Sequence, residues 1–322
     1  MTTGAVQTVF ELGGEPLTRL LERTERRMVE LASAHGPLLA QYAGQTISAG
    51  GKRLRPLLVC LAAGAPPPES DELVRAAVAV ELVHGATLVH DDVLDGSSLR
   101  RGRPTVFASG GRSAAIATGD LLFSRAFAEL AGGGSLPAVR ILSRAAGELA
   151  QGELMQRADA FDGTVSVDRY LERCRLKTAV LFRAACELGA LAGGGLVHEL
   201  GWFGEQIGLA FQLLDDVLDV TGPPERTGKP RGADLLDGTV TLPLILARLR
   251  KPSLAGLDLR EVAGAEQAAD ICEQIGLTGA LGDARSRALE LVSAAKESLP
   301  SLPERQRWAL ELVADGVVDR YS

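Results

Sequence analysis

The stretch Val74–Asp95, VRAAVAVELVHGATLVHDDVLD, joins a long apolar segment to three carboxylates. An apolar run of this length is typical of a helix that is buried on all sides. Residues four apart in a helix lie one turn above each other, so Asp91 and Asp95 point the same way, with Asp92 beside them. Such crowded carboxylates repel one another. A hard divalent cation such as Mg²⁺ would offset this repulsion, since it takes carboxylate oxygens, water and phosphate as ligands.

A second copy of the motif DDVLD occupies residues 215–219 and contains Asp215, Asp216 and Asp219. Each copy ends an apolar helical segment and precedes a polar loop that contains glycine. If the two helices face each other, six carboxylates surround one cavity and can hold several Mg²⁺ ions, which could grip a diphosphate. One copy alone would indicate only a solvated helix end. The matched pair favours a metal site.

The composition predicts an all-α fold. Of the 322 residues, 46% are apolar but only 4% are aromatic, and the apolar residues are mainly Ala, Leu and Val. This composition favours closely packed helices, and alternating patterns bounded by hairpin turns are almost absent, so strands are not expected. We expect a single domain over residues 1–322. The net charge of −7 gives no electrostatic support for a nucleic-acid partner.

The cysteines and the terminal sequence bear on the compartment. Four scattered cysteines without a CxxC pair indicate neither a zinc site nor a disulfide framework; they are Cys60, Cys174, Cys186 and Cys272. The first residues lack a basic segment followed by an apolar one, as a signal peptide would have. No uncharged apolar run reaches the roughly 18 residues of a membrane span. We therefore expect a cytoplasmic protein with no transmembrane segment.

Helical periodicity and the positions of Gly and Pro set the expected elements. The ranges with helical character are 17–31, 38–47, 52–63, 70–94, 113–130, 136–160, 167–191, 199–220, 242–249, 266–275, 278–299 and 303–313. Two polar loops are expected at 95–111 and 221–238, each directly after an aspartate motif.

Basic residues flank the acidic motifs in this net acidic chain. The segment 51–56, GKRLRP, puts cations at an expected helix start, where backbone N–H groups also favour an anion. Other cations follow the first motif, lie on a central helix, or follow the second motif; they are Arg100, Arg101, Lys177, Lys229 and Arg231. Each alone would be ordinary surface charge. Together they indicate that one diphosphate is held through metals and a second directly by cations.

On these blocks the chain resembles the trans-isoprenyl diphosphate synthases, the polyprenyl synthetase family. The matching blocks, in order, are GKRLRP (51–56), ELVHGATLVHDDVLD (81–95), LRRGRPT (99–105), LKTA (176–179), FQLLDDVLDVTG (211–222) and GKPRGADLLDGTVTLP (228–243). The resemblance implies the isoprenoid synthase fold, a helical bundle around a deep central cavity, and a homodimer. It also implies an enzyme that joins isopentenyl diphosphate head to tail to an allylic diphosphate.

The resemblance implies a role for each matched residue. The residues implied to bind isopentenyl diphosphate are Lys52, Arg55, His84 and Arg101, and Arg100 is implied to contact the allylic diphosphate. The residues implied to hold the allylic diphosphate or to face the developing cation are Lys177, Thr178, Gln212 and Lys229. The implied Mg²⁺ sites comprise Asp91, Asp92, Asp95, Asp215, Asp216 and Asp219.

One departure from the family pattern and one pair of small residues bear on the product. Thr239 stands where many members have a lysine before the TLP block, so one diphosphate-binding cation is replaced. Ala86 and Thr87, five and four residues before Asp91, are expected to line the product tunnel, where short-chain members often place an aromatic floor. Small residues there predict a medium- or long-chain all-trans polyprenyl diphosphate.

Several alternatives stay open from the sequence. The enzyme could instead be a short-chain geranylgeranyl or farnesyl diphosphate synthase. A class I terpene cyclase shares the first motif but usually carries a different second metal site. Enzymes that condense two prenyl chains head to head have different aspartate blocks. A partner subunit of a heteromeric synthase commonly loses aspartates, whereas this chain keeps all six.

Overall fold

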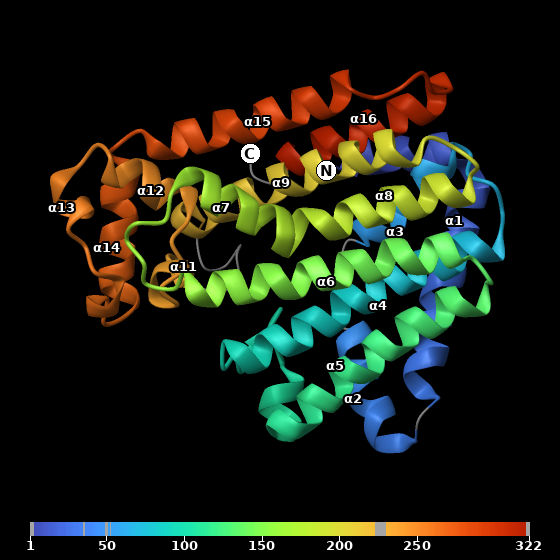
Figure 1. The fold of residues 1–322 in the computed structure, drawn as a ribbon, viewed down its shortest axis with the longest axis horizontal. Helices are drawn as coiled ribbons and strands as arrows, with labels where there is room; N and C mark the ends of the chain where they lie inside the picture. Colours follow the sequence, from blue (N-terminus) through green and yellow to red (C-terminus); the bar gives the residue numbers. More distant parts are fainter. Residues whose placement is uncertain (1–2, 35, 49–50, 52, 223–229, 320–322) are drawn as a thin grey trace.

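The computed structural model describes residues 3–34, 36–48, 51, 53–222 and 230–319 (Figure 1). The α-helices are α1 (Thr3–Ser33), α2 (Pro37–Ser48), α3 (Leu54–Ala63), α4 (Asp71–Leu94), α5 (Val106–Gly132), α6 (Leu136–Ala158), α7 (Val167–Cys174), α8 (Val180–Ala192), α9 (Val197–Thr221), α11 (Ala233–Leu236), α12 (Leu242–Arg248), α13 (Pro252–Ala255), α14 (Ala265–Gly276), α15 (Ala280–Glu297) and α16 (Glu304–Asp319). A π-helix, η1 (Arg175–Ala179), joins α7 to α8, and η2 (Leu259–Glu261) is a 3₁₀ turn. Two short antiparallel strands, β1 (Leu99–Arg100) and β2 (Arg103–Pro104), form a hairpin.

Helix α4 has the local features that the sequence predicts. Ser70 is its N-cap, and the Ser70 hydroxyl accepts a hydrogen bond from the backbone N–H of Leu73 at 3.1 Å. Two acidic residues in the first turn interact favourably with the positive end of the helix dipole. By length and composition α4 could span a membrane, but 67% of its most apolar window is buried inside the protein. It is the core helix of the bundle.

The helices pack in layers around α4 and α9, which carry the two aspartate motifs. Helix α4 lies against α3, α5 and α8, and α9 lies against α8 and α15. Figure 1 shows α6, α8, α9 and α15 extended along the long axis, while α2 and α5 project to one side. Helix α8, together with η1, therefore lies between the two aspartate helices.

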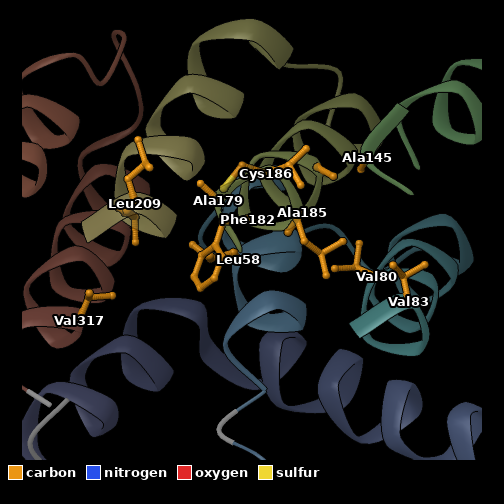
Figure 2. Close-up of a cluster of buried hydrophobic side chains, with 14 of the residues drawn as sticks. Leu58, Val80, Val83, Ala145, Ala179, Phe182, Ala185, Cys186, Leu209 and Val317 are labelled. Carbon is orange, nitrogen blue, oxygen red and sulfur yellow. The ribbon is translucent and has the colours of Figure 1, made fainter. Parts of the chain in front are cut away.

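The core between these helices is built from small apolar side chains (Figure 2). Ala145, Ala185 and Cys186, together with Val80 and Val83 of α4, are all buried members of this core (Figure 2). Small side chains let helix axes come close together, which compensates for the low aromatic content. One connected cluster of buried residues extends from Val9 to Val317. The prediction of an all-α fold is confirmed.

The structure corrects three local predictions. The segment expected to be a loop from 95 to 111 contains the β1–β2 hairpin and the first turn of α5, where the Thr105 hydroxyl caps Ala108 N–H at 3.0 Å. Gly111, with φ 76°, marks a kink inside α5 rather than a helix start. The helix expected at 167–191 is interrupted by the five-residue π-helix η1. Three short pieces, α11, α13 and η2, lie below the length at which periodicity is detectable.

Candidate active site

In the first motif, the middle aspartate is held by a cation. Asp92 is only 4% exposed, and its Oδ1 accepts a hydrogen bond from Arg100 Nε at 2.8 Å. The same oxygen forms an ion pair with Arg100 Nη2 at 2.7 Å. Arg100 is placed by the β1–β2 hairpin directly after the motif. The Asp92 carboxylate therefore competes with the allylic diphosphate that Arg100 was predicted to contact.

Asp91 lies in an environment that disfavours its charge. Burial raises the pKa of Asp91 to about 6, and the charges of Glu153 and Asp95 raise it further, while Lys177 and Arg100 act in the opposite direction. A carboxylate that is buried without full compensation gains from a bound cation. This is the chemical character expected of a metal ligand.

The outer aspartate of the same motif begins a chain of alternating charges. Arg157 Nη2 donates to Asp95 Oδ1 at 2.5 Å, and Arg157 Nε donates to Glu153 Oε1 at 2.8 Å. Glu153 Oε2 in turn accepts from Lys177 Nζ at 2.5 Å. Glu153 and Arg157 were missed in the sequence, where only their i,i+4 spacing on a helix next to the LKTA block signals an ion pair. The chain links α4, α6 and η1.

The second motif is held by neutral donors. Asp216 is 4% exposed; its Oδ2 accepts from the Tyr170 hydroxyl at 2.6 Å and its Oδ1 from Gln212 Nε2 at 2.7 Å. Burial raises the pKa of Asp216 to about 8, with a further rise from Asp234 and Asp215. Thr178 Oγ1 donates to Gln212 Oε1 at 2.6 Å. Tyr170 was also missed, since a tyrosine in an amphipathic helix carries no distinctive signal.

The remaining aspartates of this motif differ in exposure. Asp215 is exposed at the surface of α9, where it can meet a ligand. Asp219 Oδ2 accepts the backbone N–H of Asp234 at 3.3 Å, which ties the end of α9 to the start of α11. Thr239, which replaces the family's lysine, donates its backbone N–H to Asp234 O at 2.8 Å.

The π-helix η1 brings the two motifs into one site. Consecutive residues Lys177 and Thr178 contact Glu153 beside the first motif and Gln212 beside the second. Glycines on the flanking helices allow η1 to approach closely. A Cβ at Gly152 would lie 2.6 Å from the backbone N of Lys177, and one at Gly208 would lie 2.6 Å from Ala179 Cα. Larger residues at either position would displace η1.

A cluster of cations lies on the side of α4 next to α3 and the hairpin. Burial lowers the pKa of His84 well below its usual value, and the charges of Arg55 and Arg101 lower it further. His84 is therefore neutral and can donate or accept a hydrogen bond. Together with Arg100, His84 and Arg101 line a cavity of about 270 Å³ between α4, α2 and α5.

Arg55 has a buried donor that could bind an anion. Among the described residues, its Nε has no hydrogen-bond partner, and the guanidinium lies 4.6 Å from the centre of the Phe182 ring. Burial lowers the pKa of Arg55 to about 10. Arg53, two residues before, is instead paired with Glu81 at 2.7 Å. A buried unpaired donor is costly, and a diphosphate oxygen would satisfy it.

Several predicted site residues have other outcomes. Lys52 and Lys229 lie outside the described residues. Ala86 is fully buried, and Thr87 is half-buried, with its hydroxyl donating to His84 O at 2.8 Å. At 100° per residue, Thr87 lies about 40° and Ala86 about 140° around the helix axis from Asp91. Thr87 therefore shares the face of Asp91 more closely than Ala86 does.

The six aspartates do not form a preassembled ligand cluster. In the part of the chain that the structure describes, no group of three or more His, Cys, Asp or Glu side chains is arranged to hold a metal ion. The site instead brings together an acidic face at Asp91 and Asp95, a polar pair at Thr178 and Gln212, and the cation cluster.

Comparisons with known proteins agree with this arrangement. Residues 36–275 match the family described as Polyprenyl synthetase. The chain is 42% identical over 245 residues to heptaprenyl diphosphate synthase component 2 of Geobacillus stearothermophilus, which covers 75% of each chain. It is 35% identical to geranylgeranyl diphosphate synthase of Methanosarcina mazei, over 85% of this chain and 87% of that one. The structure of a Caulobacter crescentus polyprenyl synthase complexed with calcium and isoprenyl diphosphate superimposes with a TM-score of 0.90, at 36% identity and 98% coverage of both chains.

Proposed function

Because the chain belongs to the polyprenyl synthetase family, we propose that it is a prenyltransferase that condenses isopentenyl diphosphate head to tail with an allylic diphosphate. The observation that carries this proposal is the placement of η1. Lys177 donates to Glu153 beside the first motif, while Thr178 donates to Gln212 beside the second. One short element thus faces both the diphosphate that leaves and the carbon that reacts.

Asp91, Asp95 and Asp215 are the residues that would hold Mg²⁺ in this proposal. Their oxygens suit a hard cation, and the raised pKa of Asp91 reflects a carboxylate whose burial lacks full compensation. Asp92 and Asp216 fit this role less well because both are buried and already accept hydrogen bonds from side-chain donors. Asp95 is also paired, with Arg157, but it is exposed and can exchange this partner for a cation. When bound, Mg²⁺ would neutralise charge on the departing diphosphate. The calcium in the Caulobacter enzyme's complex supports a divalent cation site.

The chain's own residues bind and orient the two substrates. Arg55, Arg101 and neutral His84 would bind the diphosphate of isopentenyl diphosphate, which brings its double bond to the allylic carbon and replaces a bimolecular encounter by proximity. Lys177 would stabilise the leaving diphosphate. Thr178 and Gln212 can turn oxygen lone pairs toward the developing cation without being strong nucleophiles.

We propose a medium- or long-chain all-trans product. The support is the heptaprenyl activity named for the Geobacillus relative and the small residues Val80, Val83 and Ala86 on α4. A short-chain product is the second candidate, since the Methanosarcina relative makes geranylgeranyl diphosphate. We propose that the replacement of lysine by Thr239 changes the substrate length that the enzyme prefers.

The proposal includes an assembly and a compartment. Single apolar side chains are exposed on α5 and α6, with Ile116, Leu136 and Leu154 at 41%, 57% and 71% exposure, and we propose that this side of the protein meets a second copy of the chain. The Geobacillus relative is named as a component, so a different subunit is the alternative partner. All four cysteines are buried free thiols, which suits the reducing cytoplasm. We propose that residues 1–322 form one polyprenyl synthetase domain.

The test is incubation of the purified chain with isopentenyl diphosphate, Mg²⁺ and, in turn, geranyl, farnesyl or geranylgeranyl diphosphate. An elongated all-trans product that disappears with EDTA is expected, and its chromatographic length gives the product class. Absence of any elongated product from the chain alone, in spite of correct folding, would contradict a self-sufficient synthase. A cyclised hydrocarbon would instead identify a terpene cyclase. Light scattering during gel filtration distinguishes a monomer from a dimer.

A further inference from the structure

We propose that Tyr170 is a positioning residue for prenyl transfer, because it acts through Asp216 to fix which end of the Gln212 amide faces the reacting carbon. This inference rests on the proposed function. It assigns Asp216 to an orienting role in the second motif, distinct from that of its neighbour Asp215. The relay is Tyr170 to Asp216, Asp216 to Gln212 and Gln212 to Thr178, with three hydrogen bonds of 2.6, 2.7 and 2.6 Å.

The relay is buried at its fixed end and half-buried at its working end. Tyr170 and Asp216 are 1% and 4% exposed, whereas Gln212 and Thr178 are only partly buried. Tyr170 comes from α7, Asp216 and Gln212 come from successive turns of α9, and Thr178 comes from η1. The phenol is therefore packed in the core, while the amide and hydroxyl can meet a substrate.

The hydrogen-bond pattern determines the polarity of the amide. Asp216 Oδ1 can only accept from Gln212, so Nε2 must face Asp216 and Oε1 must face Thr178. The Thr178 hydroxyl donates its one proton to Gln212 Oε1, so the Thr178 oxygen and the Gln212 oxygen both keep free lone pairs. The arrangement holds whether or not Asp216 carries a proton, provided that the proton lies on Oδ2, toward Tyr170. Electron-rich oxygens, rather than N–H groups, then face the developing allylic cation.

A phenol suits this position better than an arginine or lysine would. The equivalent aspartate of the first motif, Asp92, is held by Arg100. A guanidinium behind Asp216 would place another positive charge near the cation that forms in the reaction, and repulsion in a dry site is strong. Tyr170 supplies a short hydrogen bond and carries no charge itself. The nearby Arg173 guanidinium, 5.5 Å from the centre of the Tyr170 ring, is paired with Asp159. The relay therefore orients the amide without adding a cation of its own.

The test is a double-mutant cycle between Tyr170→Phe and Gln212→Ala, with kcat and KM measured for both substrates. Tyr170→Phe removes one hydroxyl from a side chain that otherwise packs as before. Losing this hydrogen bond is expected to lower kcat by about 10-fold. The KM for isopentenyl diphosphate is expected to stay within about twofold. In the Gln212→Ala background the same substitution is expected to have almost no further effect on kcat, because Tyr170 acts through Gln212.

The matched control is Tyr42→Phe, which removes a phenol on α2 outside the relay and is expected to leave kcat unchanged. A multiplicative loss of kcat in the double mutant, or an unchanged kcat in Tyr170→Phe, would overturn the proposal. Asp216→Asn is a second variant. The amide introduced at position 216 could donate to Gln212 Oε1, and the Gln212 side chain would then turn its Nε2 toward the cation. The Asp216→Asn substitution is therefore expected to reduce kcat more than Tyr170→Phe does.

A spectroscopic measurement separates this inference from the proposed reaction. In protein labelled with ¹⁵N-glutamine, the Gln212 side-chain NH₂ signal is assigned by its loss in Gln212→Leu. Tyr170→Phe is expected to shift or broaden that signal, whereas Tyr42→Phe is not. An unmoved signal would overturn the relay even if prenyl transfer is found. A moved signal without prenyl transfer would support the relay and contradict the proposed function.

Discussion

The two DDVLD motifs have identical letters and different surroundings. In the first motif, the side-chain partners are charged: Arg100 holds Asp92 and Arg157 holds Asp95. In the second motif, Asp216 is held by a phenol and an amide. The first site is therefore suited to a ligand that is rich in negative charge, and the second also to a carbon that becomes positive. The packing partners, rather than the motif itself, decide what each aspartate does.

The largest expected effect comes from Asp91→Ala. Removing a carboxylate that we propose to hold Mg²⁺ is expected to lower kcat/KM by about 10³-fold or more, on the scale of lost electrostatic stabilisation in other active sites. Steady-state kinetics at saturating Mg²⁺ measures it. Asp92→Ala is the comparison within the motif, and its loss of kcat/KM should be smaller because Asp92 is engaged by Arg100. Near-normal turnover in Asp91→Ala would contradict the proposal that Asp91 binds the metal while Asp92 mainly pairs with Arg100.

Arg100→Leu tests whether the middle aspartate of the first motif depends on its cation. The substitution leaves the buried Asp92 carboxylate without its ion pair, so we expect the free energy of unfolding to fall by about 3 kcal/mol. Tyr170→Phe, the corresponding change in the second motif, should cost about 1 to 2 kcal/mol. Urea denaturation measures both, with the exposed Arg112→Leu as control. Equal losses for Arg100→Leu and Tyr170→Phe would contradict the electrostatic contrast.

Asp91→Asn should stabilise the protein while it inactivates the enzyme. Because folding raises the pKa of Asp91 from 3.8 to about 6, its ionisation opposes folding, and stability is lost as the pH rises through this window. In EDTA at pH 8, the neutral amide is expected to increase the free energy of unfolding by on the order of 2 kcal/mol. At pH 4 and below, the gain should vanish because both forms are neutral. A gain that does not change between pH 4 and 8 would exclude this cause.

Substitution of Thr87 is expected to have the smallest effect on the reaction rate but a measurable effect on the chain length of the product. Thr87→Phe places an aromatic ring near the face of Asp91 and is expected to shorten the product while turnover is largely kept. Chromatography of the products measures the chain length. Thr87→Val, which keeps the size but removes the hydrogen bond to His84 O, is the control and should leave the length unchanged. Ala86→Phe tests the neighbouring position, where full burial makes overpacking the main hazard.

Regular helices and paired motifs could be predicted because they depend on local periodicity. The range expected at 70–94 corresponds to α4, and that at 199–220 corresponds to α9. The hairpin and the early start of α5 were missed because Thr105 acts as an N-cap inside a segment rich in Gly and Arg. The roles of Glu153, Arg157 and Tyr170 could not be predicted because they depend on how α6 packs against η1 and the end of α4, and α7 against α9. Their partners lie 24 to 62 residues away in the chain.

The π-helix η1 has a consequence for protein engineering. Its wider turn contains one residue more than an α-helix needs, so a single deletion within Arg175–Ala179 could be absorbed by a regular helix joining α7 to α8. Such a deletion would rotate one of the two side chains at Lys177 and Thr178 by about 100° relative to its present direction. We expect a folded bundle in which Glu153 and Gln212 no longer meet neighbouring residues of the same turn. Deleting one codon would thus yield a folded protein that lacks the paired contacts of Lys177 and Thr178, which separates their role from that of the rest of the bundle.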